Sequence, residues 1–233
     1  MGRHQEPASL SYLEALFSLT GLRAVVTGGS SGIGRGIAEA LAGAGAAVHI
    51  VARDQGRIDE VCASLRANGA EAAGSAVDLT DELATCGFAD GEVLRGCDIL
   101  VNCAGINPRP EFAQTTDAEY AEVMAVHVRA PYLLGQAAGP AMVARGFGRI
   151  INVGSQQSWM AFGRSGIYGV SKAATAGLTR SQAEAWSPYG VTVNTLIPGF
   201  VVTPLTAATV AEPGREEALA ARSMTKRNGV PVD

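Results

Sequence analysis

The chain has 233 residues, of which 17% are charged, and its formal net charge is -4. This length favours one large α/β domain over two ordinary ones. The low charge, without runs of like sign, argues against nucleic acid or an anionic membrane as a partner. No apolar run approaches the roughly 20 residues that a membrane-spanning helix needs.

Residues 1–20 are expected to form a lead-in to the main domain. Residues 1–7 are polar and lack the apolar core of a signal peptide, while 10–19 have a short amphipathic pattern. The four cysteines (Cys62, Cys86, Cys97 and Cys103) have no metal-ligand or disulfide-framework spacing. We therefore expect reduced thiols, no metal site and a cytoplasmic location.

From residue 21 onward, short apolar runs alternate with alanine-rich segments of helical period. This alternation predicts one domain, 21–233, with a doubly wound Rossmann-type parallel sheet and helices on both faces. The expected strands are 23–27, 48–52, 72–77, 98–102, 149–153 and 191–197. The expected helices are 33–43, 56–67, 117–144 and 165–186, with a short or broken helix in the glycine-interrupted segment 80–96.

A glycine-rich turn joins the first strand to the first helix of this domain. It reads Thr27-Gly28-Gly29-Ser30-Ser31-Gly32-Ile33-Gly34, which is a Gly-x-x-x-Gly-x-Gly spacing. Glycines at a strand-to-helix turn let backbone N–H groups approach a pyrophosphate at the positive end of the helix dipole. A plain turn is the competing interpretation, but the position after the first strand favours a phosphate site.

The second strand ends in Ala52-Arg53-Asp54, where a carboxylate would hold the ribose hydroxyls of NAD. Ala52 is small and neutral, and Arg53 offers several N–H donors to a 2′-phosphate. These residues favour NADP(H) over NAD(H). Alternatively, Arg53 is a surface residue paired with Asp54.

Tyr168 and Lys172 lie four residues apart, and this lysine is one of only two in the chain, the other being Lys226. Residues at this spacing share one face of a helix. A nearby ammonium favours the phenolate and lowers the tyrosine pKa from about 10. The pair therefore suits proton transfer, although Tyr-x-x-x-Lys also occurs by chance.

Taken in order, the motifs resemble those of the classical short-chain dehydrogenase/reductases over roughly residues 18–233. The matching residues are Thr27-Gly28-x-x-x-Gly32-x-Gly34, Asp78, Asn102-Cys103-Ala104-Gly105, Ser155, Tyr168-x-x-x-Lys172 and Pro198-Gly199-x-x-x-Thr203. Within the family, the resemblance is greatest to sugar-acid dehydrogenases of the gluconate type and to 3-oxoacyl-carrier-protein reductases.

The resemblance implies a catalytic set of Ser155, Tyr168 and Lys172. Ser155 would hold the substrate oxygen, Tyr168 would transfer the proton, and Lys172 would hold the nicotinamide ribose and lower the tyrosine pKa. Asp78 would accept a hydrogen bond from the adenine amino group. The residues expected at the cofactor are Gly28, Ser30, Ser31, Gly32, Ile33, Gly34, Arg53, Asp78, Leu79, Asn102, Ala104, Gly105, Tyr168, Lys172, Pro198, Gly199 and Thr203.

The substrate is expected to meet Ser155, Gln157, Arg164 and Tyr168, under a flexible flap formed by residues 204–223. Arg109 and Arg164 could bind a substrate carboxylate, or they could be solvated surface arginines. The resemblance thus implies an NADP(H)-dependent oxidoreductase that interconverts a secondary alcohol and a ketone on a small polar substrate, working as a homodimer or homotetramer.

The chain departs from the family pattern at two places. His127 stands where the family has an asparagine, so it is either a structural histidine or a pH-sensitive member of the proton relay. The chain stops at Asp233, before the family's last strand, which would leave the sixth strand with an unpaired edge; it is either a fragment or a natural truncation. These departures motivate the alternative of a catalytically quiescent NADP(H)-binding or regulatory protein.

Overall fold

Six parallel strands form one sheet in the order β3-β2-β1-β4-β5-β6. The computed structural model describes residues 10–164 and 166–233. The strands are β1 (Arg23–Thr27), β2 (Ala47–Ala52), β3 (Ala72–Ala76), β4 (Ile99–Asn102), β5 (Gly148–Val153) and β6 (Val191–Leu196). Each strand boundary lies within one residue of the sequence-based prediction, so the predicted fold class is confirmed.

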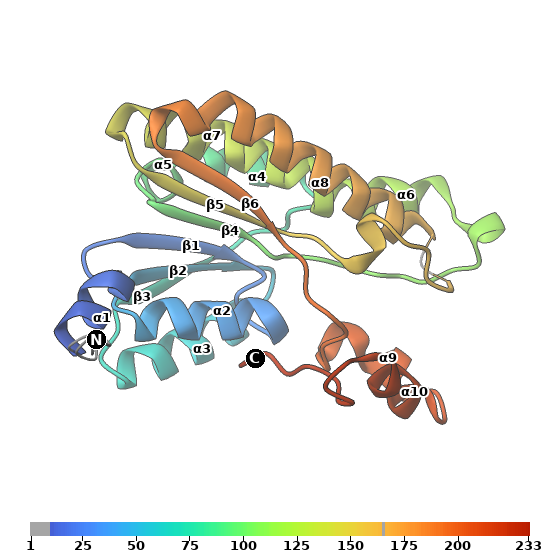
Figure 1. Ribbon diagram of the computed structural model, residues 1–233. Coiled ribbons are helices and arrows are strands. Elements are labelled where there is room, and N and C mark those ends of the chain that lie inside the picture. The colour runs from blue at the N-terminus through green and yellow to red at the C-terminus, as the bar shows by residue number, and fades with distance from the viewer. Residues whose placement is uncertain (1–9, 165) are drawn as a thin grey trace, which may run out of the picture.

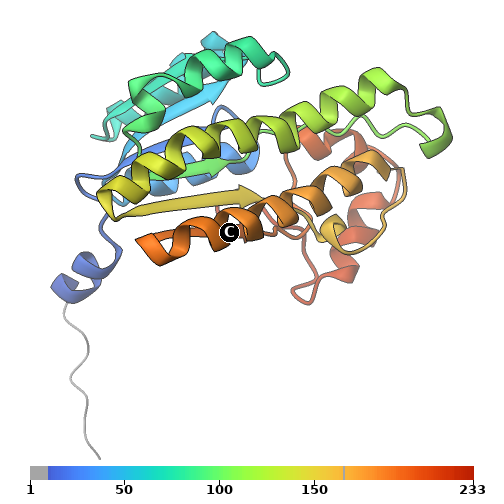
Figure 2. The same cartoon turned by 90° about the horizontal axis from the view of Figure 1, so that it is seen from above.

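Helices cover both faces of this sheet (Figure 1). On one side lie α2 (Gly32–Gly43) and α3 (Gln55–Ala67), and on the other lie α4 (Glu82–Ala89), α5 (Glu92–Arg95), α7 (Ala130–Arg145) and α8 (Gly166–Trp186). Figure 2 shows α7 and α8 running side by side over their face. Residue 165, the first of the expected helix 165–186, lies outside the described residues.

Two apolar cores result because neighbouring strand residues point to opposite faces. Val25 and Leu100 belong to the core under α7, together with Leu134. Val26 belongs to the other core, together with Ile58 of α3. All four residues of β4 are buried, as expected for a central strand of a parallel sheet.

The expected helix 117–144 contains a π-helical turn that periodicity did not predict. It comprises α6 (Asp117–Met124), the π turn η2 (Ala125–Arg129) and α7. The amide of Ala130 donates to the carbonyl of Ala125, five residues back. Such insertions occur mostly as single turns and often near functional sites, and this one contains His127.

The segment after β6 contains η5 (Pro204–Thr206), α9 (Ala207–Val210) and α10 (Arg215–Arg222). The chain then returns toward the sheet, with a bridge between Val201 and Gly229. Pro231 lies against α2, since a Cβ on Gly36 would lie 3.0 Å from the carbonyl carbon of Pro231. In the described chain, β6 is an edge strand of the sheet.

In the lead-in, α1 (Leu10–Phe17) precedes β1 and keeps Leu16 and Phe17 exposed. Residues 1–9 of the predicted lead-in lie outside the described residues. In the part of the chain that the structure describes, no helix is both long and apolar enough to cross a membrane.

Candidate active site

The predicted site residues meet at the carboxyl edge of the sheet. They follow or end all six strands: Thr27 ends β1, Arg53 follows β2, Asp78 follows β3, Asn102 ends β4, Ser155 follows β5 and Pro198 follows β6. In an open α/β sheet this edge is where ligands bind.

The glycine turn is a cradle that side chains would fill. Gly28 has φ +70°, and a Cβ there would lie 2.8 Å from the Cα of Ala104. A Cβ on Gly34 would lie 2.7 Å from the carbonyl carbon of Gly28. Both glycines are therefore required by close backbone approach, which leaves the first turn of α2 open for a phosphate group.

The β1 and β4 ends are fastened together beside this cradle. The hydroxyl of Thr27 accepts hydrogen bonds from the amides of Cys103 at 3.0 Å and Ala104 at 3.2 Å. Asn102 is buried and donates to the side chain of Asn152 at 2.8 Å. These contacts join the carboxyl ends of β1, β4 and β5 beside the cradle.

Ser31 and Arg53 offer unengaged polar groups next to the cradle. Ser31 is the N-cap of α2 but makes no side-chain cap hydrogen bond. Arg53 is exposed and, within the described chain, forms no hydrogen bond or ion pair; Asp54 instead pairs with Arg57 at 3.5 Å. The predicted alternative of an Arg53–Asp54 pair is therefore not observed, and the guanidinium is available to a phosphate.

Asp78 is oriented by a turn after β3. Its Oδ1 atom accepts the amide of Thr80 at 2.9 Å and the hydroxyl of Thr80 at 2.8 Å. The bond from the Thr80 amide is the main reason that the pKa of Asp78 is lowered, and the charge of Arg53 lowers it further against the effect of burial. Asp78 is thus an ionised acceptor beside Arg53, while neighbouring Leu79 is buried.

The proposed catalytic residues come from β5 and α8. Ser155 follows β5 and accepts the amide of Gln157 at 3.2 Å. Tyr168 and Lys172 lie one turn apart on α8, with the Lys172 ammonium 5.5 Å from the centroid of the Tyr168 ring. Lys172 Nζ donates to the carbonyl of Val153 at 2.7 Å.

The pKa of Tyr168 is shifted in the direction opposite to the sequence-based expectation. Burial raises it, and a hydrogen bond with Ser155 only opposes the shift. The expectation that Lys172 lowers this pKa is wrong for this structure, because the ammonium is turned to the Val153 carbonyl. Ser155, not Lys172, is the group that favours the phenolate here.

Lys172 is fully buried, and burial lowers its pKa to about 8. Nearby Cys103 is partly buried, and desolvation raises the pKa of its thiol to about 11. Near neutral pH the pair is therefore an ammonium beside a neutral thiol. No carboxylate among the described residues pairs with this ammonium, and a buried cation without such a partner is costly, so Lys172 is a candidate functional residue.

His127 is buried with both ring nitrogens engaged. Nε2 accepts the amide of Ile106 at 3.0 Å, and Nδ1 lies 2.7 Å from the Ser171 hydroxyl, which donates to the carbonyl of Tyr168. Since the Ile106 amide can only donate, the ring is neutral with its proton on Nδ1. Burial lowers the pKa of His127 well below 6.5, so it is uncharged at neutral pH.

The arginines considered for substrate binding already have acidic partners. Arg109 forms an ion pair with Glu212 at 3.6 Å and a hydrogen bond to Thr209, and Arg164 pairs with Glu111 at 3.3 Å. Gln157 is partly buried and lies beside Gly169 of the catalytic helix. Gln157 thus remains at the site, whereas Arg164 is exposed and turned to Glu111.

Contacts from two other segments of the chain hold the segment after β6 over this edge of the sheet. Arg109 bonds Thr209 of α9, and the guanidinium of Arg215 lies 5.0 Å from the ring centroid of Phe162, in the loop between Ser155 and Tyr168. At its start, Thr203 lies against the glycine turn, since a Cβ on Gly32 would lie 3.2 Å from Thr203. Thr203 therefore lies next to the glycine cradle.

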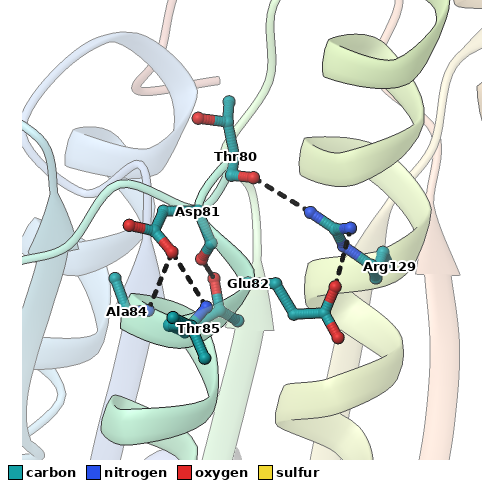
Figure 3. A network of polar contacts seen from close by, with 7 residues as sticks. Thr80, Asp81, Glu82, Ala84, Thr85 and Arg129 are labelled. Carbon is teal, nitrogen blue, oxygen red and sulfur yellow. Dashed lines mark hydrogen bonds and ion pairs between the residues drawn. The ribbon is translucent and has the colours of Figure 1, made fainter.

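Three residues were missed from the sequence. Ser171 links His127 to Tyr168, Phe162 contacts α10, and Arg129 holds the turn that carries Asp78 (Figure 3). Ser171 and Phe162 lie between or beside recognised motifs, but nothing in a single sequence gives their partners. Arg129 has no local signal because Thr80 is 49 residues away.

The parallel sheet, the glycine cradle and the polar residues at its carboxyl edge define a dinucleotide-binding α/β protein. The family model described as short chain dehydrogenase matches residues 23–214. Gluconate 5-dehydrogenase of Gluconobacter oxydans is 38% identical over 201 residues, which cover 84% of this chain and 78% of the relative. Galactitol 2-dehydrogenase (L-tagatose-forming) of Cereibacter sphaeroides is 40% identical over 196 residues, covering 82% and 76%.

Solved structures of related enzymes have the same fold. The gluconate 5-dehydrogenase of Burkholderia cenocepacia J2315, in complex with NADP and tartrate, has a TM-score of 0.88 at 32% identity, covering 94% of this chain and 87% of that one. The 3-oxoacyl (acyl-carrier-protein) reductase of Agrobacterium tumefaciens C58, with NADP bound, has a TM-score of 0.88 at 33% identity, covering 94% and 86%. The chain belongs to the short-chain dehydrogenases, a family of oxidoreductases that act on CH–OH groups.

Proposed function

We propose that the protein is an NADP(H)-dependent oxidoreductase that interconverts a secondary alcohol and a ketone on a small polar substrate. The observation that carries this proposal is the convergence of Ser155, Tyr168 and Lys172 at one strand edge, beside the glycine cradle. The named relatives are dehydrogenases and reductases, which favours an active enzyme over a quiescent nucleotide-binding protein.

Several residues fit NADP(H). The cradle at Gly28–Gly34 accommodates the pyrophosphate, and Arg53 supplies free donors to the 2′-phosphate. Asp78 and Leu79 take the adenine, while Pro198, Gly199 and Thr203 take the nicotinamide amide. NADP in the two solved relatives supports this choice. The bound cofactor would supply the hydride in ketone reduction and accept it in alcohol oxidation.

In the proposed chemistry, Tyr168 donates or accepts the proton at the substrate oxygen. Ser155 holds that oxygen. Its hydrogen bond with Tyr168 also favours the phenolate, because it lowers the pKa of Tyr168. Lys172, whose ammonium donates to the Val153 carbonyl in the described structure, would hold the nicotinamide ribose of the bound cofactor. Its pKa of about 8 keeps it cationic in neutral solution.

His127 is proposed to be structural and not a member of the relay. Its Nε2 atom is taken by a backbone amide, which gives up no proton at neutral pH, and its Nδ1 proton is used by Ser171. The imidazole instead lies edge-on to the Tyr168 ring, with centroids 5.3 Å apart at 85°. His127→Asn is expected to leave the pH–rate profile unchanged between pH 6 and 8.

The substrate is proposed to be a polyhydroxy acid or sugar alcohol. Two buried polar atoms beside the site, Oδ1 of Asn107 and Nε of Arg215, have no partner in the described residues, and a polyhydroxy compound offers both donors and acceptors to them. Gluconate, galactitol and tartrate in the names of relatives are compounds of this kind. η5, α9 and α10 would act as the flap over it.

A substrate screen tests the proposal. Gluconate, galactitol and a panel of related hydroxy acids and polyols are offered with NADP⁺, and their oxo forms with NADPH, while absorbance of NADPH is followed. We expect turnover with at least one polar hydroxy compound and a preference for NADP(H). A protein that binds NADPH yet turns over no member of the panel would instead support the quiescent alternative.

We also propose that the protein is a homo-oligomer. An apolar groove formed by α6, η2, α7 and α8 faces outward; it is lined by Ala121, Met124, Ala125, Val128, Tyr132 and Leu178, and also by Arg129, and Tyr132 is exposed. A second copy of the same helices would cover this groove symmetrically. Light scattering should give a dimer or tetramer mass, and a monomer at micromolar concentration would contradict the assignment.

A further inference from the structure

The turn that carries Asp78 is held from both sides by side chains outside the catalytic set. Thr80 binds Oδ1 of Asp78 through its amide and its hydroxyl, which leaves Oδ2 without a hydrogen-bond partner in the described structure. On the helix side, Asp81 caps α4 by accepting the amides of Leu83 at 2.8 Å and Ala84 at 3.1 Å. The orientation of Asp78 thus depends on where Thr80 lies.

Arg129 holds Thr80 from the helical segment that packs beside α4 (Figure 3). Its Nη2 donates to the carbonyl of Thr80 at 2.9 Å, and its Nη1 forms an ion pair with Glu82 at 3.0 Å (Figure 3). The guanidinium spans both partners because its donors form a rigid planar fork. Arg129 is the last residue of the π turn η2, so its position is set by the helix that also carries His127.

This contact is more specific than a surface ion pair. The side chain of Arg129 is 42% exposed and that of Glu82 is 60% exposed, so the ion pair alone contributes little. The bond to the Thr80 carbonyl is different, because it acts on the backbone between Asp78 and the start of α4. Losing it frees the segment whose geometry sets the Asp78 carboxylate.

We propose that Arg129 is a positioning residue for the adenine half of the cofactor. By holding the Thr80 carbonyl, it keeps Oδ2 of Asp78 directed toward the adenine amino group. The inference rests on the proposed function in one respect, namely the role of Asp78 as the adenine acceptor. A purely structural Arg129 would instead stabilise the fold without affecting which base is bound.

The test compares two cofactors in variants of the full chain. Dissociation constants are measured for NADPH and for its analogue in which hypoxanthine replaces adenine, so that the amino group is missing. Arg129→Met removes both donors and keeps the aliphatic stem. Glu82→Gln removes only the ion pair, and Arg145→Met removes a similar arginine clamp, on the carbonyls of Arg95 and Cys97 far from Asp78.

Wild type should bind NADPH about 10-fold more tightly than the analogue, the usual effect of a hydrogen bond to a charged group. In Arg129→Met this preference should fall below about 2-fold through weaker NADPH binding, with kcat at saturating cofactor unchanged. Both controls should keep the preference. Thr80→Val removes the hydroxyl bond to Asp78 and should give a preference for NADPH between those of wild type and Arg129→Met. This variant replaces Arg129→Met in the test if Arg129→Met does not fold.

The inference is overturned if Arg129→Met keeps the full preference, or if it weakens both cofactors equally. Absence of a preference in wild type would overturn it together with the role of Asp78. That last result would leave the proposed hydride transfer standing, because turnover with NADPH is measured separately.

Discussion

Lys172 is a buried cation on the helix that also carries Tyr168. Burial lowers its pKa from 10.5 to about 8, so below pH 8 the folded state bears a desolvation cost of about 3 kcal/mol for holding it charged. Between pH 8 and 10.5 the unfolded chain binds more protons at this site than the native one. The contribution of Lys172 to stability therefore rises with pH across this window.

Lys172→Met should remove this pH dependence. We expect the variant to gain unfolding free energy relative to wild type at pH 7, and the gain to shrink at pH 9.5. Cys103 and His127, which interact electrostatically with Lys172, stay neutral across most of this range because their pKa values are about 11 and well below 6.5. Urea unfolding measures the difference, with exposed Lys226→Met as control. A gain that is equal at both pH values would contradict the prediction.

Arg53 should decide between the two nicotinamide cofactors. Arg53→Ala is expected to raise the dissociation constant of NADPH about 10-fold or more while leaving that of NADH nearly unchanged, because only NADPH carries the 2′-phosphate. Arg57→Ala is the matched control, since Arg57 is already paired with Asp54. Fluorescence titration measures both cofactors, and an equal loss for NADH would refute the assigned contact.

Two of the four glycines in α2, Gly34 and Gly43, have opposite steric requirements. A Cβ on Gly34 would collide with the backbone of Gly28, whereas a Cβ on Gly43 meets nothing within 4 Å. Gly34→Ala should destabilise the protein by at least about 2 kcal/mol and weaken NADPH binding. Gly43→Ala should stabilise it by about 0.5–1 kcal/mol. Thermal unfolding of both variants tests the pair, and similar shifts would contradict it.

The sequence predicted the regular elements closely, because buried β-branched strands and amphipathic helices have distinct periods. It did not predict the π turn at Ala125–Arg129, since one inserted residue barely disturbs the apolar period of the helix 117–144. It also predicted Tyr168 and Lys172 as a pair but gave the wrong direction for the tyrosine pKa. Helical spacing places the two side chains on one face but does not give the Val153 carbonyl as the partner of Lys172.

The contacts that join distant segments could not be predicted from the sequence for a different reason. Arg109 meets Thr209 and Glu212 about a hundred residues further along, and Arg129 meets Thr80. Arginine and its partners are common surface residues, so neither pairing leaves a local pattern. Both contacts form because the strand order brings the segments that carry these residues to the same edge of the sheet.

At the scale of the whole molecule, the strand order separates the two halves of the site. Arg53 and Asp78 follow β2 and β3 on one side of β1, while Ser155 and Pro198 follow β5 and β6 on the other side of β4. The glycine turn lies between them, at the end of β1. A dinucleotide along this edge would have its adenosine over β2 and β3 and its nicotinamide beside Tyr168.

Tyr168 is proposed to transfer the proton in the hydride-transfer reaction, and Tyr168→Phe removes the hydroxyl that would do so. The variant removes one hydroxyl from a buried ring, and Tyr189→Phe, at an exposed tyrosine, is the matched control. With the best substrate of the screen, kcat should fall by about 100-fold or more while the dissociation constant of NADPH stays within about 2-fold. Turnover in Tyr168→Phe close to that of wild type would contradict the account.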